Sequence, residues 1–180
     1  PTYAASQNHK GYEVPSYALE SKDGAFELRR YAPHIVASVA VNGTRQKAVG
    51  RGFRMLARYI FGGNATGEKI KMTAPVAQAP RDANSWEITF TMPSRYKLDT
   101  LPKAKQDSIR FYEAPVSRQA VVVFTGRWGA ARLQEEEVRL ADWIRSSGLT
   151  VTSEPRYYFY DDPMTLPWRR RNEIARLVES

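Results

Sequence analysis

The sequence predicts an α+β fold made of two similar halves, each with antiparallel strands and one helix. Many short segments alternate apolar and polar residues with a period of two, which is typical of antiparallel strands. Two longer segments, 45–61 and 131–146, instead have the apolar spacing of amphipathic helices. The order strand, turn, strand, helix, strand occurs twice, with an offset of roughly 80 residues. Two antiparallel sheets, or one curved sheet closed on itself, with one helix per half, is the simplest arrangement.

The composition is that of a folded chain with enough apolar material for a sizeable core. Of the 180 residues, 42% are hydrophobic and 26% are charged. No apolar run approaches the roughly 18 residues of a membrane helix, so we expect a soluble protein without a transmembrane segment. The chain has no cysteine, which excludes disulfides, thiolate metal sites and cysteine nucleophiles.

The formal net charge of +8 favours anionic partners, which include nucleic acid, lipid surfaces and small acids. Arg169–Arg171 follow Trp168, but no nucleic-acid reader motif is present and acidic residues are interspersed throughout. We therefore do not expect a nucleic-acid partner. Because the first residue is proline, we expect that a native start was removed, and a cytoplasmic or an exported location fits equally well. The oligomeric state stays open.

The first half of the predicted domain, about residues 12–93, follows a polar leader at 1–11 that lacks periodicity and is expected to be flexible. Thr44 is the candidate N-cap of the helix at 45–61. Gly62–Asn64 ends that helix. The extended segments are predicted at 12–19, 26–30, 35–41, 70–76 and 86–92.

The second half, about residues 109–180, repeats this order after a polar connection at 94–108. Strands are predicted at 109–113, 121–124, 151–160 and 174–178, and the helix at 131–146. Residues 12–180 are therefore expected to form a single domain built from two pseudo-repeats.

The helix at 45–61 carries the most distinctive surface pattern. One broad arc is apolar, and a basic row follows it at one-turn spacing. The row consists of Lys47, Arg51, Arg54 and Arg58. Between Phe53 and the row lie the small residues Gly50 and Ala57, which form a flat apolar strip. The planar guanidinium of arginine pairs well with carboxylates, so the strip could hold a small flat anion. The simpler interpretation is a helix surface that faces solvent.

Catalytic chemistry has little support. The chain has two histidines, His9 and His34, and no Ser–His–Asp order, HExxH helix or phosphate-binding glycine loop. The run Glu135–Glu137 is interpreted as a solvated helix face, and Asp161–Asp162 before proline as turn chemistry. Met72 is interpreted as a core thioether rather than a metal ligand. We therefore assign no catalytic and no metal-binding residue.

Several long motifs resemble the SOUL/haem-binding protein family. The segment KIKMTAPV at 69–76 follows a helix that ends in YIFGGN, and FELRRYAP, WEITFTMP and YDDPMTLPWRRRNEI occur in the expected order. The resemblance extends over about residues 12–178. It implies a distorted antiparallel β-barrel built from two repeated halves, with one helix per half packed on the outside, related to GyrI-like ligand-binding domains.

The resemblance also implies a function, which is non-covalent binding of haem or another tetrapyrrole as a carrier, buffer or sensor. In related members the cleft lies between the first helix and the C-terminal proline loop. A porphyrin needs apolar area for its face and cations for its propionates. The residues carried over to the helix wall are Gly50, Phe53, Arg54, Ala57 and Arg58. Those carried over to the loop wall are Tyr160, Pro163 and Met164.

The chain departs from the family at the positions that concern iron. Some members carry histidine, proposed as an axial ligand, where this chain has Arg30. Gly50 replaces a basic residue, and Phe53 and Ala57 stand where relatives have methionine. No axial ligand is therefore expected. Two alternatives stay open: an interaction or sensing module for another apolar anion, and, as the more remote one, a hydrolase that uses the same cleft.

Overall fold

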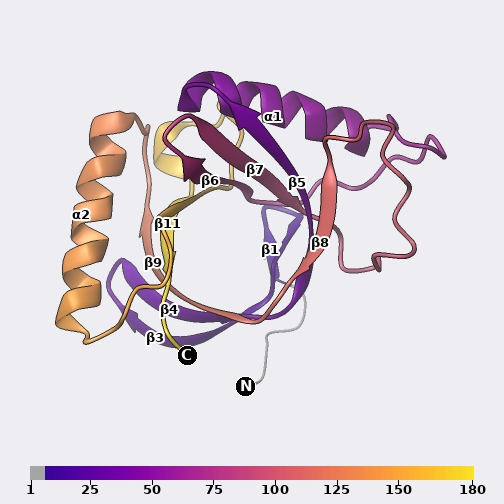
Figure 1. The fold of residues 1–180 in the computed structure, drawn as a ribbon. Coiled ribbons are helices and arrows are strands. Elements are labelled where there is room, and N and C mark those ends of the chain that lie inside the picture. The colour runs from indigo at the N-terminus through magenta and orange to yellow at the C-terminus, as the bar shows by residue number, and fades with distance from the viewer. Residues whose placement is uncertain (1–6) are drawn as a thin grey trace. The chain divides into compact units, whose positions relative to one another are not determined.

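The computed structural model describes residues 7–180, and its elements are labelled in Figure 1. They form two compact units. The α1 unit contains residues 7–15 and Pro33–Pro115, and the α2 unit contains Ser16–Ala32 and Val116–Ser180. Each unit has an antiparallel sheet and one long helix. The predicted α+β fold class is confirmed. No helix among residues 7–180 is both long and apolar enough to cross a membrane.

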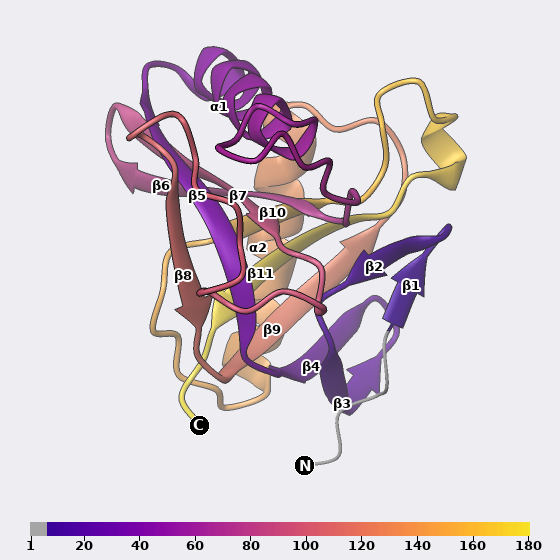
Figure 2. The ribbon, with the colours of Figure 1, turned by 90° about the vertical axis from the view of Figure 1, so that its right-hand side faces the viewer.

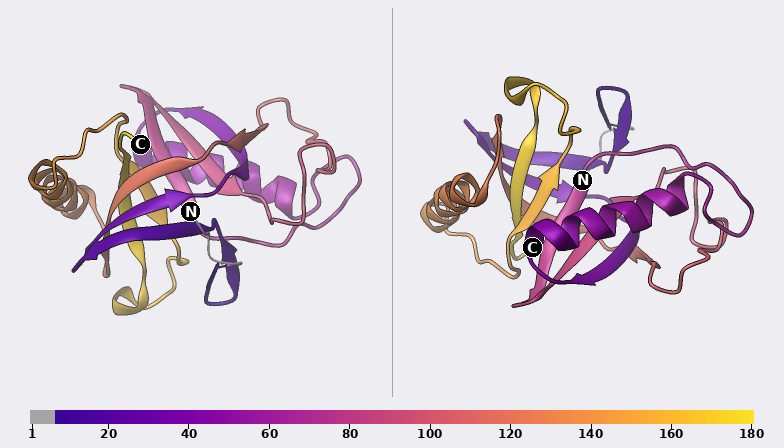
Figure 3. Two further views of the ribbon diagram at one scale, coloured as in Figure 1. Left: turned by 90° about the horizontal axis from the view of Figure 1, so that it is seen from below. Right: turned by 90° about the horizontal axis from the view of Figure 1, so that it is seen from above.

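The sheet of the α1 unit has the strand order β6-β7-β5-β8, and β8 lies at its edge beside β5 (Figure 2). Helix α1, Arg45–Ile60, packs across β5 and β7 (Figure 3). Its residues Leu56, Tyr59 and Ile60 are buried against Ile88 and Phe90 of β7. The strands are β5 His34–Asn42, β6 Val76–Asp82, β7 Ser85–Thr91 and β8 Arg110–Ala114.

The sheet of the α2 unit has the order β3-β4-β9-β11-β10. Helix α2, Ala130–Ser146, contacts β9 and β11, and its buried residues include Leu133, Leu140 and Ile144. The ring of Trp143 stacks on Phe26 at 5.4 Å between centroids. The strands are β3 Tyr17–Asp23, β4 Phe26–Tyr31, β9 Ser117–Phe124, β10 Arg156–Phe159 and β11 Asn172–Leu177, and Pro167–Arg169 forms the short helix η1.

The two predicted repeats, 12–93 and 109–180, exchange one strand each. Within each repeat the strands after the helix pair with each other, as β6–β7 and β10–β11. The strand before the helix pairs with the last strand, as β5–β7 and β9–β11. One further strand of each repeat pairs with the other repeat, since β4 pairs with β9 and β8 pairs with β5. The compact units are therefore not the two halves of the chain.

Several local predictions differ from the structure. The strand predicted at 151–160 is reduced to β10, Arg156–Phe159, and Val151 forms only an isolated bridge with Val178. No strand forms over 70–75, where the amides of Ile70 and Ala74 donate to the carbonyls of Ile60 and Glu13. Strand β6 begins only at Val76, after Pro75. Thr44 occupies the N-cap position of α1, but its side chain makes no capping hydrogen bond. In the predicted leader, residues 1–6 lie outside the described part, whereas β1, Gln7–His9, pairs with β2, Tyr12–Val14.

Replacing two glycines of α1 by alanine should change the stability of the protein in opposite directions. A Cβ at Gly52 would lie 2.6 Å from Ile88 Cγ1 and 3.2 Å from Val39 Cγ2, whereas one at Gly50 would meet only the Arg54 guanidinium at 3.5 Å. Gly52→Ala should therefore lower the free energy of unfolding by about 1–3 kcal/mol. Gly50→Ala should raise it by about 0.5–1 kcal/mol, because alanine favours helix. Urea denaturation of both variants checks this, and equal effects would contradict the packing at Gly52.

Candidate functional site

Helix α1 presents the five predicted wall residues on its outward side. Gly50, Phe53 and Ala57 follow one another at three and four residues, which places them on one helix face. Above Gly50 the surface is open, since only the Arg54 guanidinium comes near an added Cβ. Phe53 is 40% exposed although its ring lies 5.9 Å from Phe90. Phe53 thus combines an anchored ring with an exposed apolar face.

Cations border this face. Helix α1 contains no acidic residue, and the four side chains of its basic row are exposed. Over residues 7–180, none of the four forms a hydrogen bond or ion pair with a carboxylate. The row consists of Lys47, Arg51, Arg54 and Arg58. These charges are therefore available to anions from solution.

The predicted loop wall lies in the other unit, between β10 and β11. Its Met164 is 89% exposed and Pro163 is exposed, whereas Tyr160 is only 7% exposed. The Tyr160 hydroxyl donates to Glu173 Oε1 at 2.7 Å, and the Arg171 guanidinium lies 4.1 Å from the Tyr160 ring centroid. Tyr160 is thus a member of a buried network. That these loop residues share a ligand with α1 stays a prediction from the family resemblance.

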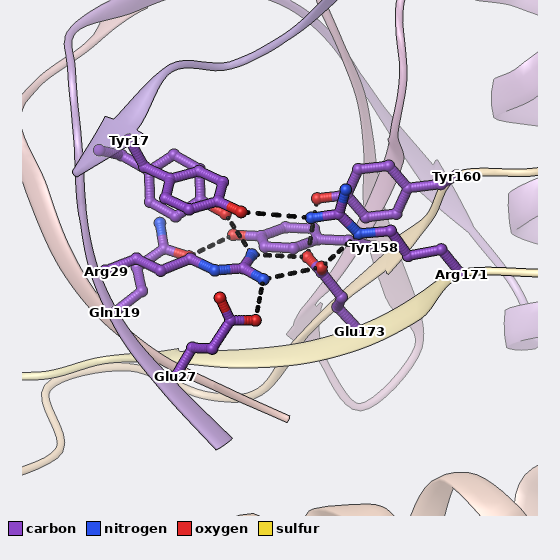
Figure 4. Close-up of polar contacts among 9 residues, drawn as sticks. Tyr17, Glu27, Arg29, Gln119, Tyr158, Tyr160, Arg171 and Glu173 are labelled. Carbon is purple, nitrogen blue, oxygen red and sulfur yellow. Dashed lines mark hydrogen bonds and ion pairs between the residues drawn. The ribbon is translucent and has the colours of Figure 1, made fainter. Parts of the chain in front are cut away.

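The buried network in the α2 unit is centred on Arg29 of β4 and Glu173 of β11, both fully buried (Figure 4). Arg29 Nη1 and Nη2 donate to the two carboxylate oxygens of Glu173 at 2.8 and 2.9 Å. Arg29 also donates to Tyr31 at 2.9 Å and to Glu27 at 2.9 Å. Arg171 Nε donates to Glu173 Oε2 at 2.8 Å. Glu173 therefore receives four hydrogen bonds, counting that from Tyr160.

The electrostatics of this network oppose proton transfer. Burial alone would raise the pKa of Glu173, but the guanidinium groups of Arg29 and Arg171 hold that pKa below its ordinary value. Burial and the nearby Glu173 carboxylate raise the pKa of Tyr160 well above its ordinary value. Glu173 is thus held ionised and Tyr160 protonated, which suits a structural network and disfavours a tyrosinate ligand for iron.

The sequence interpretation missed this network, although a signal was present. With a period of two, Glu27, Arg29 and Tyr31 share one face of β4, and Arg171 and Glu173 share one face at β11. Opposite charges on one face of each of two strands that also carry core residues such as Leu28 and Ile174 are a signal of a buried pair. The run Glu135–Glu137 was also misjudged as solvated, because Glu136 is 3% exposed and accepts hydrogen bonds from Arg132 and Arg139.

The described residues offer no cluster that resembles a metal site. No group of three or more histidine, cysteine or acidic side chains that could hold a metal ion occurs among residues 7–180. Met72 is partly buried and packs against the core of the α1 unit, as expected for a core thioether.

Comparison with known proteins assigns the chain to a family. A family model described as SOUL heme-binding protein matches residues 12–177. Heme-binding protein 2 of Homo sapiens is 30% identical over 173 residues, covering 91% of this chain and 82% of that protein. Its counterpart in Mus musculus is 27% identical over 184 residues, covering 95% and 88%. The chain belongs to the SOUL haem-binding protein family.

Solved structures show the same fold at lower identity. The EcmrR C-terminal domain superposes with a TM-score of 0.67 at 16% identity, covering 86% of this chain and 97% of that one. A hydrolase from Listeria innocua superposes at 0.59 with 12% identity, covering 89% and 94%. At such identity the likeness concerns the fold alone. The predicted family is confirmed by the sequence matches.

Removing the central carboxylate should destabilise the protein strongly. Glu173→Gln leaves the fully buried Arg29 with Glu27 as its remaining counter-charge and removes the carboxylate that the half-buried Arg171 contacts. The free energy of unfolding should therefore fall by about 3–5 kcal/mol. The matched control is Glu20→Gln, since Glu20 bonds Arg30 and Arg118 at 2.9 Å each but lies partly exposed. That change should cost about 0–1 kcal/mol. Equal costs in urea denaturation would contradict the central role of Glu173.

The depressed pKa of Glu173 predicts a pH dependence. A carboxyl whose pKa is lower in the folded state than in the unfolded state stabilises the folded protein. Its full contribution is present when the pH is above the unfolded-state pKa, which is near the ordinary 4.5. This contribution is lost as the pH falls through the lower folded-state pKa. The difference in unfolding free energy between the native chain and Glu173→Gln should therefore narrow between pH 6 and pH 3, roughly the window that linkage sets. A constant difference would contradict the assignment.

Proposed function

We propose that this protein binds haem or a related tetrapyrrole non-covalently on the outward face of α1, as a carrier, buffer or sensor. Membership of a haem-binding family makes a tetrapyrrole the first ligand to consider. The observation that carries the proposal is the exposed apolar strip bordered by cations that lack carboxylate partners within residues 7–180. It combines the two properties that a porphyrin requires: flat apolar area and positive charge for its propionates.

The residues present fit this ligand. Gly50 and Ala57 leave room for a planar ring, and Phe53 offers an exposed aromatic face. Arg54 and Arg58 are placed to pair with carboxylates, for which the planar guanidinium suits bidentate bonding. Burying several hundred Å² of ring at ~25 cal/mol per Å² supports roughly micromolar affinity once ordering costs are subtracted.

The proposal includes no chemical turnover and no protein ligand to iron. Arg30 stands where some relatives have histidine, and it donates to Glu20 at 2.9 Å. The most buried carboxylate, Glu173, is occupied by Arg29, Arg171 and Tyr160. When bound, haem would supply its iron and its conjugated ring, while this chain supplies apolar area and cations. Haemin and metal-free porphyrin should therefore bind with similar affinity.

Titration with haemin and with protoporphyrin IX, followed at the Soret band, tests this proposal. The native chain should give saturable shifts with both, within about tenfold of each other because no iron ligand contributes. Arg58→Glu should weaken binding about tenfold by turning attraction for a propionate into repulsion. Ala57→Trp should abolish binding by filling the strip.

Matched controls lie on α2. Arg145→Glu changes an exposed arginine in the last turn of the other helix, and Ala141→Trp enlarges a half-exposed alanine there. Both should bind like the native chain. A shift absent from the native chain, or equally affected by the α1 and α2 variants, would overturn the proposed site. If both porphyrins fail while another apolar anion raises the melting temperature, the site binds a different ligand class.

A further inference from the structure

The loop between β10 and β11 exposes an unusual set of apolar side chains. Met164, Leu166 and Trp168 are 89%, 48% and 70% exposed. Figure 2 shows this loop projecting beyond the ends of β10 and β11, the strands that it connects. A soluble surface rarely exposes several large apolar side chains so close together in sequence unless they have a partner. We call residues 161–170 the tryptophan loop.

Hydrogen bonds hold the tryptophan loop in this exposed conformation. The Arg170 guanidinium donates to the carbonyls of Pro163 at 2.6 Å and Thr165 at 2.8 Å. The carboxylate of Asp161 accepts from the amide of Arg171 at 2.6 Å. The apolar side chains are therefore displayed by a braced backbone, and a partner meets them with little ordering cost.

A second loop is joined to this one. The amide of Gly126 donates to the carbonyl of Pro167 at 2.9 Å, and Asn172 Nδ2 donates to the carbonyl of Gly126 at 2.9 Å. Trp128, two residues on, is 37% exposed and stacks on Phe159 with centroids 4.1 Å apart. The neighbouring side chains Arg127 and Arg169 are both exposed. The joined loops thus combine exposed tryptophans with exposed arginines.

We propose that the tryptophan loop attaches the protein to the surface of an anionic lipid bilayer. Tryptophan prefers the membrane–water interface, where its ring is apolar and its N–H remains hydrated. Leu166 and Met164 would enter the acyl region, while Arg127 and Arg169 remain at the level of the phosphates. The net charge of +8 adds attraction to such a surface. The attachment is interfacial and needs no membrane-spanning helix.

We favour an anionic bilayer over a protein partner because the exposed apolar side chains are accompanied by the exposed Arg127 and Arg169 and by a net charge of +8. This inference does not rest on tetrapyrrole binding. Met164 is shared with the predicted tetrapyrrole contacts, so the test uses Leu166 and Trp168, which are not.

Sedimentation with vesicles of phosphatidylcholine alone, and with 30% phosphatidylserine added, tests the proposal on the full chain. The native protein should bind the anionic vesicles and bind neutral ones at least about tenfold more weakly. The double change Leu166→Ser and Trp168→Ser should lower the partition coefficient at least about tenfold, because it removes the inserted apolar area. Arg127→Gln with Arg169→Gln should lower it by roughly 25-fold, since each cation contributes roughly fivefold.

The matched control also replaces two exposed apolar residues, Leu98 and Val138, which are 48% and 55% exposed elsewhere. Leu98→Ser with Val138→Ser should leave binding unchanged. Lipids brominated on their acyl chains should quench the native fluorescence, and Trp168→Phe should remove most of this quenching while retaining binding.

Any one of the following results would overturn the proposal. The first is no binding to anionic vesicles at low salt. The second is equal loss of binding in the loop variant and in the Leu98/Val138 control, or unchanged quenching in Trp168→Phe. The third is a lipid-free change of oligomeric state on Leu166→Ser with Trp168→Ser, which would assign the tryptophan loop to a protein contact.

Discussion

The buried ion pair between Arg29 and Glu173 is the interaction on which the α2 unit depends. Arg29 lies on β4, near the start of the chain, and Glu173 on β11, near its end, with β9 between these strands. A buried charge without its partner costs several kcal/mol. The pair therefore joins β4 to β11 across β9, and it links parts of the α2 unit that are distant in the chain.

This network and the face of α1 use charge in opposite ways. In the network, the Glu173 carboxylate accepts hydrogen bonds from Arg29, Arg171 and Tyr160, so its oxygens are already bonded within the protein. On α1, the exposed Arg54 and Arg58 have no carboxylate partner within residues 7–180. The first arrangement stabilises a fold, and the second can recognise an anion from solution. For this reason we place the proposed ligand on α1, although the network is the more conspicuous polar cluster.

The sequence predicted most elements because their signals are local. The helix expected at 45–61 is found at Arg45–Ile60, and the strand expected at 86–92 at Ser85–Thr91. Alternation reports which side chains are buried but not which strand is the partner, so the exchange of β4 and β8 could not be predicted. Alternation also predicted a strand at 70–76, because Ile70 and Ala74 are both buried. Their amides nevertheless donate to Ile60 and Glu13, and no strand forms before Val76. Helical periodicity predicted the apolar strip and the basic row of α1, and the family resemblance made them an expected ligand wall. The Arg29–Glu173 pair instead depends on strands far apart in sequence.

The central claim is that the outward face of α1 binds the ligand. Amide chemical shifts of the isotope-labelled full chain, recorded while protoporphyrin IX is added, test it most directly. The account predicts that saturable shifts concentrate on residues 50–58, including Gly50, Phe53 and Ala57, and spare the exposed face of α2. Shifts confined to α2, or an α1 that does not respond while ligand binds elsewhere, would contradict it.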